Sequence, residues 1–311
     1  LTFRCYTTVR QSSRASRRSG AWMAVFALFR ADTSCARMVT SAKRAALPEF
    51  CPLQLEQMIA ELVRFDQGWI PSGDGTALYI PPICIGTDAS LGVTRPTASK
   101  LVVVCSPVGA YLTAGRKPVK LYANPAHSRV APGGAGAFKM GCNYAPTIAI
   151  TDEAAAHGCD QSLWLWGRNQ LITEAGTSNI FLYWRNKNNE LELITPPTKD
   201  GLILPGVIRD CVLTLAREWN EFTVTERFPT MMELMEAAGD GRILELFCTG
   251  TPSVVAPCEQ IVYKAKPNEE PVAIDIPEQR DAKPLFERLR ETTTGIQYGK
   301  VDRPEWVRIV N

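Results

Sequence analysis

The stretch "GGAGAFKMGCNYAPT", residues 133–147, places Lys139 between a glycine-rich run and an Asn-Tyr pair. The small residues around it predict a tight, interior passage of the backbone. Burial removes the hydration of a lysine ammonium and lowers its pKa, so that the neutral amine becomes a nucleophile. The obvious use is a Schiff base with the carbonyl of an aldehyde cofactor or of a substrate. The alternative, a lysine with a packed stem and a solvated ammonium, stays open on this stretch alone.

The composition favours an ordinary globular enzyme. The chain has 311 residues, of which 45% are hydrophobic and 21% charged, and its length predicts two domains. A net charge of +2 indicates neither a nucleic-acid nor another polyanionic partner. No apolar run reaches the roughly 20 residues that a membrane span requires.

Cysteine and histidine usage excludes several kinds of site. The ten cysteines are scattered, with neither a CxxC pair nor zinc spacing, and predict free, buried thiols in a reducing compartment. Of the two histidines, His157 is expected to cap a helix end before Gly158, and His127 to lie on a surface loop. A Ser-His-Asp triad, a Cys-His pair and a metal site are therefore not supported.

The N-terminal residues have an unusual composition. The run "LTFRCYTTVRQSSRASRRSG" is rich in Arg, Ser and Thr, and no acidic residue precedes Asp32. It is typical of a mitochondrial transit segment, whereas a chain fragment or a wrongly assigned gene start is equally compatible. Four segments are expected: a disordered basic leader (1–25), a small α/β domain (26–112), an interdomain linker (113–126) and a large domain (127–311).

The pattern of elements predicts an α+β fold. Apolar residues at helical spacing indicate a helix over 53–65, and further helices are expected over 145–158, 204–219 and 230–241, the last opened by a capping box of Thr230 and Glu233. Short β-branched runs predict strands, including 118–123, 179–184, 190–195 and 242–257. Strict βαβ alternation is absent, which disfavours a doubly wound sheet.

Three further windows suit the chemistry of Lys139. Glu174 stands beside a glycine turn, where a carboxylate can pair with a protonated ring nitrogen. The backbone N–H groups of Val207 and Ile208 open a predicted helix and suit a phosphate. A turn with Thr249 and Thr251 offers hydroxyl groups. Together these windows meet the needs of pyridoxal 5′-phosphate.

The motifs themselves resemble a known family. Residues 133–147, "LWLWGRNQLITEAGTSNIFLYW" (163–184), "LITPPTKDGLILPGVIRD" (193–210), "FCTGT" (247–251) and "GIQYG" (295–299) are similar to those of branched-chain amino-acid aminotransferases, which are fold-type IV pyridoxal-phosphate enzymes. The resemblance runs from about residue 26 to the C-terminus. It implies a two-domain fold-type IV architecture, like that of D-amino-acid aminotransferase, whose small N-terminal domain is incomplete here.

The resemblance implies a role for each matching residue. Lys139 matches the catalytic lysine, which binds the cofactor as an aldimine and moves the proton between Cα and C4′. Tyr144 matches the residue on the cofactor's phenolic oxygen, and Glu174 the acid on its ring nitrogen. The other expected cofactor-binding residues are Arg30, Arg129, Thr177, Val207, Ile208 and Thr251. The expected substrate-binding residues are Tyr79, Tyr111, Thr177, Thr251 and Pro252.

The implied reaction is the transfer of nitrogen from leucine, isoleucine or valine to 2-oxoglutarate. Leu91 and Val93 match a loop that reaches into a partner subunit, so the resemblance implies a homodimer. The implied location is the cytoplasm or the mitochondrion, in branched-chain amino-acid metabolism or a secondary pathway. Two alternatives remain: a degenerate cofactor-binding relative with little activity, and another fold-type IV enzyme such as a D-amino-acid transaminase or a lyase.

The sequence departs from the family at four places. Pro81 replaces an arginine that handles the distal carboxylate of the substrate, and Pro252 removes a backbone donor to its α-carboxylate. The family's redox CxxC is replaced, with Ser253 and Ala256 at its cysteine positions. The basic leader stands where the family has the first strands of the small domain, so we expect the sheet behind Tyr79 to lack paired strands.

Overall fold

The computed structural model describes residues 3–4, 7–18, 21–73, 75–89, 91–109, 118–278 and 283–310, with side chains from residue 26 onward. The chain divides into two units. The first comprises Leu1–Arg116, Phe138–Gly141 and Thr292–Asn311, and the second Lys117–Ala137 and Cys142–Glu291. This division corrects the expected boundaries, because the C-terminal residues and the segment around Lys139 group with the first unit.

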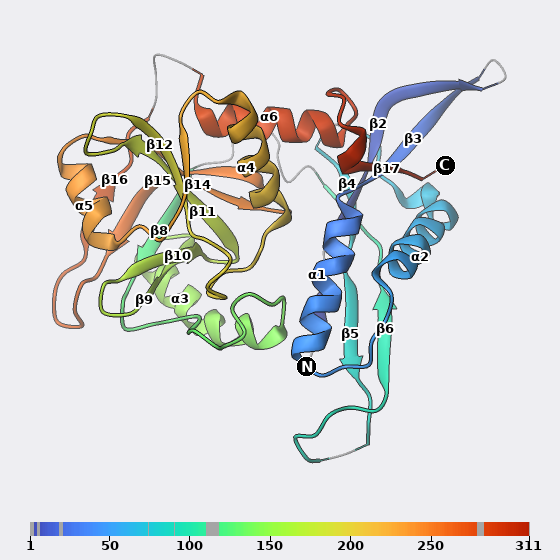
Figure 1. The fold of residues 1–311 in the computed structure, drawn as a ribbon, viewed down its shortest axis with the longest axis horizontal. Helices are drawn as coiled ribbons and strands as arrows, with labels where there is room; N and C mark the ends of the chain where they lie inside the picture. Colours follow the sequence, from blue (N-terminus) through green and yellow to red (C-terminus); the bar gives the residue numbers. More distant parts are fainter. Residues whose placement is uncertain are drawn as a thin grey trace. The chain divides into compact units, whose positions relative to one another are not determined.

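Among the described residues, the first unit contains two antiparallel sheets, two helices of its own and the end of a third (Figure 1). The five-stranded sheet has the order β17-β3-β2-β4-β7, and the three-stranded sheet the order β1-β5-β6. Its helices are α1 (Ala31–Arg44) and α2 (Pro52–Phe65), followed by the short η1 (Gln67–Trp69). Its strands are β1 (Phe3–Arg4), β2 (Thr7–Arg18), β3 (Ala21–Phe29), β4 (Ala77–Ile80), β5 (Pro82–Gly86), β6 (Ser99–Val103), β7 (Ser106–Val108) and β17 (Val307–Ile309), the last after η4 (Pro304–Trp306).

The N-terminal strands overturn the expectation of a disordered leader for residues 7–18 and 21–25. Strand β2 pairs with β3 on one side and with β4 on the other, where Thr8 lies opposite Tyr79. The sheet behind Tyr79 is therefore paired, contrary to the expected loss. The physical reason is that strand pairing uses backbone groups, so arginine side chains do not prevent it. Thr and Val in "TTVR" also favour the extended conformation.

The helix over residues 53–65 forms as expected, with one difference on its buried face. Leu55, Ile59 and Val63 are buried, whereas Met58 is exposed. Glu56 is buried instead, and its carboxylate lies 2.9 Å from the Arg308 guanidinium of β17. The spacing of apolar residues within one helix cannot predict an ion pair with a residue this far away in the chain.

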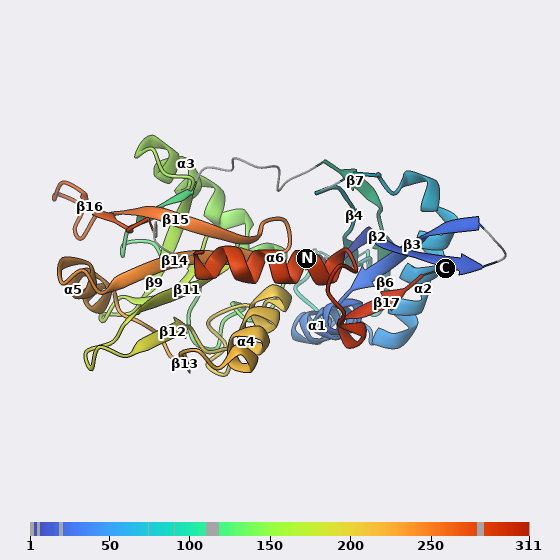
Figure 2. The ribbon, with the colours of Figure 1, turned by 90° about the horizontal axis from the view of Figure 1, so that it is seen from above.

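The second unit is built on a nine-stranded sheet. The path is β10-β9-β8-β15-β14-β11-β12-β13, β16 pairs with β15, and a pairing of β10 with β11 closes a six-stranded barrel. Figure 2 shows β15, β14, β11 and β12 following one another across this sheet. The strands are β8 (Val119–Ala123), β9 (Gln161–Trp166), β10 (Leu171–Ala175), β11 (Ser178–Arg185), β12 (Leu191–Thr195), β13 (Thr223–Glu226), β14 (Ile243–Gly250), β15 (Val254–Tyr263) and β16 (Val272–Asp275).

Strand β8 corrects the expected linker of residues 113–126. It lies between β9 and β15 and pairs in parallel with both, and Leu121 and Ala123 are fully buried in the barrel core. Residues 110–117 lie outside the described part of the chain. The glycine- and proline-punctuated break therefore ends before Val119.

Helices and short turns complete the second unit. They are η2 (Gly141–Asn143), η3 (Ala145–Thr147), α3 (Ile148–Ala156), α4 (Val207–Trp219), α5 (Met231–Gly239) and α6 (Leu285–Gln297), which runs on into the first unit. The predicted capping box is confirmed: the Thr230 side chain accepts from Glu233 N–H, and the Glu233 carboxylate accepts from Thr230 N–H. The α+β class is also confirmed.

The cysteines agree with the sequence analysis in the part of the chain that the structure describes. The nine cysteines described are all free thiols, and six of them are buried. Cys248 and Cys258 bring their sulfur atoms within 3.4 Å on neighbouring strands β14 and β15. No helix among the described residues is long and apolar enough to cross a membrane.

Candidate active site

A tight turn between β10 and β11 forms the centre of the candidate site. Gly176 has a φ of 54°, and Gln161 occupies the space that a Cβ at Gly176 would need, so glycine is required there. Gly176 N–H donates to Ser162 O (2.7 Å), and its carbonyl accepts from Trp164 Nε1 (2.8 Å). The turn is thus fixed on β9, and it places Glu174 directly opposite Asn179.

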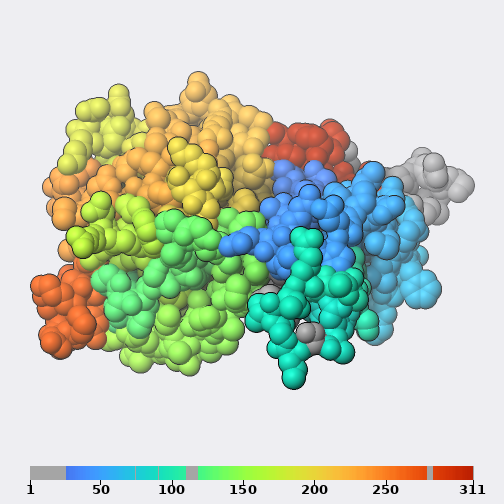
Figure 3. All heavy atoms as spheres, turned by 60° about the horizontal axis from the view of Figure 1, so that its bottom comes forward, coloured from blue at the N-terminus to red at the C-terminus, as the bar shows by residue number. Residues whose placement is uncertain are grey.

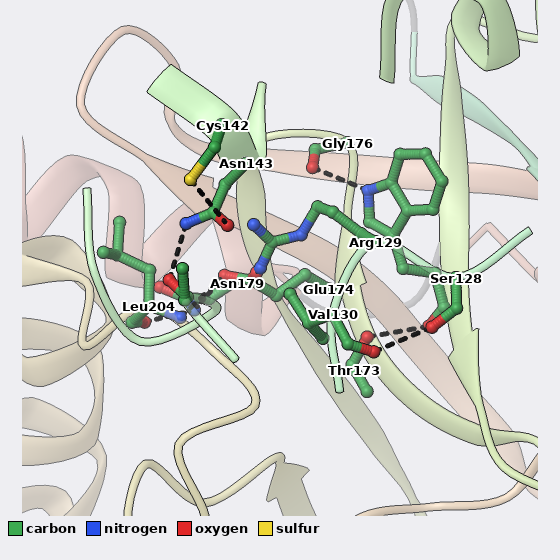
Figure 4. Close-up of polar contacts among 12 residues, drawn as sticks. Ser128, Arg129, Val130, Cys142, Asn143, Thr173, Glu174, Gly176, Asn179 and Leu204 are labelled. Atoms are coloured by element: carbon green, nitrogen blue, oxygen red, sulfur yellow. Dashed lines mark hydrogen bonds and ion pairs between the residues drawn. The ribbon is translucent and has the colours of Figure 1, made fainter. Parts of the chain in front are cut away.

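Glu174 is a buried carboxylate with three donors. Its Oε1 accepts from Asn179 Nδ2 (3.1 Å) and from Leu204 N–H (3.2 Å), and its Oε2 pairs with the Arg129 guanidinium. Figure 4 shows the three donors around Glu174: Asn179 comes from β11, Leu204 from the segment before α4 and Arg129 from the loop after β8. Donors of this kind, one of them cationic, favour the ionised carboxylate over the acid. A carboxylate offers about four acceptor positions, so one more donor can be accommodated.

Arg129 is the buried cation that pairs with this carboxylate. Burial lowers the pKa of the Arg129 guanidinium to about 10, and the charge of Tyr144 opposes that shift. The guanidinium therefore stays protonated at neutral pH. Its Nε is buried and donates no hydrogen bond to any described residue. Buried polar atoms in proteins are usually hydrogen-bonded, so Arg129 Nε is a donor that a ligand could use.

The start of helix α4 lies beside the same network. Gly206 is the N-cap, and Val207 and Ile208 begin the helix with buried side chains. The first N–H groups of a helix have no intrahelical partner, and the helix dipole makes this end attractive to anions. The local structure at Val207 and Ile208 is therefore the one that an anion cradle requires.

The turn between β14 and β15 brings the threonines of the "FCTGT" motif to the same region of the sheet. Thr249 lies opposite Asn179 in the β11–β14 register, and its buried hydroxyl has no partner among the described residues. Thr251 is half-buried and Pro252 exposed in the turn. Val254 closes the turn with a φ of 55°, a costly conformation for a β-branched residue.

Lys139 is buried, and its segment groups with the first unit. The side chain is 9% exposed, and the backbone N–H donates to Ser41 Oγ on α1 (3.0 Å). Burial agrees with the expectation from the glycine-rich stretch. The residues on either side of this four-residue segment, up to Ala137 and from Cys142, belong to the second unit. Within the second unit, Asn143 holds the two sides of this passage together, since its Nδ2 donates to Ala135 O (2.6 Å).

Arg30 and Tyr79 lie in the first unit. Arg30 is the N-cap of α1 with a φ of 48°, and it is held by Thr33 (2.9 Å) and by stacking of its guanidinium on Trp306 (5.4 Å). Tyr79 is half-buried on β4, and Pro81 follows between β4 and β5. Tyr111 lies outside the described residues. Thr177, in the second unit, is exposed in the Gly176 turn.

The loop between β5 and β6 carries Leu91 and Val93. Both side chains are fully exposed. In Figure 3 the teal atoms of this region form a protruding part of the first unit. Exposed apolar side chains on a projecting loop suit an interaction surface.

Both histidines lie where the sequence predicts, and both have partners that it does not predict. His157 caps α3 as predicted, and its ring also stacks on Tyr122 at 4.5 Å. His127 lies on a loop as expected and is half-buried: its Nε2 lies 2.8 Å from Glu153 Oε2, and Tyr122 and Asn124 donate to the same carboxylate. Because Glu153 lies on helix α3, this network attaches the loop of residues 124–127 to that helix. Arg129 follows two residues later.

The sequence analysis does not single out Asn179. It lies five residues after Glu174, and the intervening "AGTS" is a tight-turn signal. A two-residue turn at Gly176 and Thr177 places residues 174 and 179 opposite each other, so hairpin geometry could have revealed this pairing.

Comparison with known proteins now decides the family. The family model described as amino-transferase class IV matches residues 22–261. The chain belongs to the class IV aminotransferases. This aminotransferase is 46% identical over 281 residues to the cytosolic branched-chain-amino-acid aminotransferase of Caenorhabditis elegans, covering 90% of this chain and 68% of that protein. It is 44% identical to the mitochondrial branched-chain-amino-acid aminotransferase of Bos taurus, over 90% of this chain and 70% of that protein.

A solved structure supports the fold of this class IV aminotransferase. The branched-chain amino acid aminotransferase of Thermobaculum terrenum, in its PLP form, superposes with a TM-score of 0.75 at 23% identity. The alignment covers 100% of this chain and 89% of that one. The fold-type IV architecture expected from the motifs is therefore confirmed.

Proposed function

We propose that this chain is a pyridoxal-phosphate-dependent transaminase that moves an amino group between leucine, isoleucine or valine and 2-oxoglutarate. The observation that carries the proposal is the identity of 44–46% with branched-chain aminotransferases over 90% of the chain. The buried carboxylate at Glu174 and the free helix terminus at Val207 supply the local chemistry that this reaction needs.

The residues of the second unit fit the cofactor. Arg129 Nε and Thr249 Oγ1 are buried polar atoms without a partner among the described residues, and both flank Glu174 or Asn179. Natural proteins rarely leave such atoms unpaired unless a ligand or water completes them. The N–H groups of Val207 and Ile208, with Thr251, suit the phosphate, and the free acceptor position of Glu174 suits the ring nitrogen.

Each residue has a distinct task in the proposed reaction. Bound pyridoxal 5′-phosphate supplies an aldehyde that takes up the amino group and a ring that withdraws electrons. Glu174, held ionised by Arg129, keeps a proton on the ring nitrogen. Lys139 Nζ would hold the cofactor, and the same amine, once the substrate's amino group has released it, would carry the proton between the substrate Cα and the cofactor C4′. Tyr144 donates to the phenolic oxygen, and Arg30 adds positive charge for the phosphate.

The proposed substrate residues are Tyr79, Tyr111, Thr177, Thr251 and Pro252. Thr177 and Thr251 sit in the two turns that flank Asn179, where their hydroxyls can receive the α-carboxylate. Pro81 lacks the donor that the distal carboxylate prefers, so we expect 2-oxoglutarate to bind weakly relative to an apolar 2-oxo acid. Pro252 lacks a backbone donor for the α-carboxylate, which all acceptors share.

We also propose that the enzyme works as a homodimer in the cytoplasm or the mitochondrion. Leu91 and Val93, fully exposed on the β5–β6 loop, are the proposed contacts with a second subunit. The relatives include cytosolic and mitochondrial branched-chain aminotransferases, which supports either location.

Absorbance spectroscopy tests the cofactor role of Lys139. We expect the apoprotein to develop the visible band of a lysine-bound cofactor on addition of pyridoxal 5′-phosphate, and L-leucine to bleach it. Lys139→Ala should lose the band, whereas Lys120→Ala, a change at a partly exposed lysine paired with Glu259, should keep it. A band that survives Lys139→Ala would refute the assignment of this lysine.

Half-reactions test the substrate class. L-leucine, L-isoleucine and L-valine should each convert the bound cofactor, and 2-oxoglutarate should restore the starting spectrum. D-alanine should leave the spectrum unchanged. Conversion by D-alanine and not by L-leucine would reject the branched-chain assignment in favour of a D-amino-acid transaminase.

A further inference from the structure

Asn179 connects the two halves of the candidate site in the second unit. It is 4% exposed on β11, opposite Glu174 on β10 and opposite Thr249 on β14. Its Nδ2 donates to Glu174 Oε1 (3.1 Å) and to the carbonyl of Leu204 (2.9 Å). Both amide hydrogens are thereby used, and the side chain has a single possible orientation.

Leu204 closes a small network with these two residues. Its N–H donates to Glu174 Oε1 (3.2 Å), while its carbonyl accepts from Asn179. Pro205 and Gly206 follow Leu204 directly and lead into α4, whose first N–H groups form the proposed phosphate cradle. Because proline restricts the backbone on both of its sides, the position of Leu204 determines where α4 begins.

The oxygen of the same amide contacts the helix start. Asn179 Oδ1 fills the space that a Cβ on Gly206 would occupy. Gly206 has φ −71° and ψ 135°, values that any residue can adopt. A side chain at this position is therefore excluded by Asn179 and not by the backbone conformation. Asn179 thus touches the carboxylate through its nitrogen and the helix start through its oxygen.

We propose that Asn179 is a positioning residue that sets the distance between the ring-nitrogen acid Glu174 and the phosphate cradle at Gly206–Ile208. The inference rests on the proposed cofactor chemistry and deepens it. The ring nitrogen and the phosphate of a rigid cofactor must bind at the same time. A fixed distance between Glu174 and the start of α4 therefore lowers the entropy cost of binding. Asn179 itself binds no part of the substrate in this assignment.

Cofactor analogues separate this role from a merely structural one. Dissociation constants are measured for apoprotein with pyridoxal 5′-phosphate, which engages both ends, and with pyridoxal, which lacks the phosphate. In Asn179→Leu we expect the preference for the phosphorylated form to fall about tenfold, because the helix start is no longer held at the distance that lets both ends of the ligand bind at once. A general loss of packing would weaken both ligands alike and leave the preference unchanged.

Gly206→Ala tests the same role without deleting any hydrogen-bonding group. Its methyl group displaces Asn179 Oδ1, so the preference should fall in the same direction. Adding Gly206→Ala to Asn179→Ala should cause no further loss, because the smaller side chain leaves room for the methyl group. If Asn179→Leu does not fold, this pair of variants carries the test.

Thr195→Val is the matched control. Thr195 is fully buried on β12, and its hydroxyl donates to Ile180 O (2.8 Å) in the same sheet and not to Glu174 or α4. It removes one buried hydrogen bond and should leave the preference unaltered. An unchanged preference in both Asn179→Leu and Gly206→Ala would overturn the role of Asn179. That result would leave the proposed function intact if the wild-type band still depends on Lys139, whereas a wild-type protein without the band would reject the function itself.

Discussion

The guanidinium of Arg129 pairs with the carboxylate of Glu174 in the interior of the second unit, where the two side chains are only 5% and 4% exposed. The residues are 45 positions apart in the chain. Arg129 follows β8, and Glu174 lies in β10, which is separated from β8 by β9. The pair therefore links the loop after β8 to the turn that closes the barrel.

Removal of one partner of this pair should destabilise the apoprotein. We expect Arg129→Gln to lower the free energy of unfolding by about 3–5 kcal/mol, because Glu174 is left as a buried, underpaired charge. Lys187→Gln, at an exposed pair with Glu236 (3.0 Å), should cost less than about 1 kcal/mol. Denaturant unfolding of both variants gives the comparison, and equal losses would contradict a structural role for the buried pair.

The turn at Gly176 should tolerate no side chain. We expect Gly176→Ala to lower the free energy of unfolding by about 1–3 kcal/mol from backbone strain at positive φ, with a further loss from overlap with Gln161. Gln161→Ala in the same background should recover only the overlap. Gly239→Ala, at the end of α5 with open space around it, is the control and should be neutral or slightly stabilising. A Gly176→Ala protein as stable as the wild type would show that the turn is not constrained.

The sequence is informative where the signals are local. The capping box of Thr230 and Glu233, the helix over 53–65 and the strand over 179–184 all rest on neighbouring residues, and each forms as predicted. Burial of Lys139 is likewise predictable from its small neighbours. The order of the motifs also identifies the fold, because the turn at Gly176 and the helix start at Gly206 follow one another as they do in branched-chain aminotransferases.

Features that depend on distant partners are not predictable from local sequence. Strand β2 forms in an arginine-rich segment because β3 and β4 both pair with it, and local composition does not report pairing. The grouping of residues 292–311 with the first unit has the same origin, since β17 pairs with β3. The loop position of His127 is predicted correctly, but its hydrogen bond to Glu153 is not, because the two residues are 26 positions apart in the chain.

Alkaline pH should weaken the second unit through Tyr122. Burial, together with the hydrogen bond to Glu153, raises the pKa of Tyr122 from 10.0 to about 12. The folded state therefore keeps the proton that the unfolded state loses above pH 10, so the stabilisation is complete below pH 10 and is lost as the pH rises toward 12. Tyr122→Phe should be less stable at neutral pH, with a deficit that narrows over this interval. Denaturant unfolding at a series of pH values measures the deficit, and a constant gap between the two proteins would exclude this linkage.

Replacement of Pro81 should change the choice between amino acceptors. An arginine at this position can pair with the distal carboxylate of 2-oxoglutarate, which the apolar 2-oxo acid of leucine lacks. We expect Pro81→Arg to improve kcat/KM for 2-oxoglutarate about tenfold to a hundredfold relative to that apolar acceptor. Steady-state kinetics with both acceptors measures the ratio, and Pro81→Gln controls for loss of the proline ring. An unchanged ratio would place Pro81 away from the distal carboxylate.

Replacement of Pro252 should instead act on every acceptor alike. Pro252→Ala restores a backbone N–H in the turn after Thr251, and all amino acids and 2-oxo acids share the α-carboxylate that it would bind. We expect KM to fall about tenfold for 2-oxoglutarate and for the apolar 2-oxo acid of leucine, with their ratio preserved. Pro257→Ala, on β15 in the same unit, is the control and should leave both values unaltered. A change confined to one acceptor would show that Pro252 faces the substrate side chain, because only a contact with the common carboxylate acts equally on both.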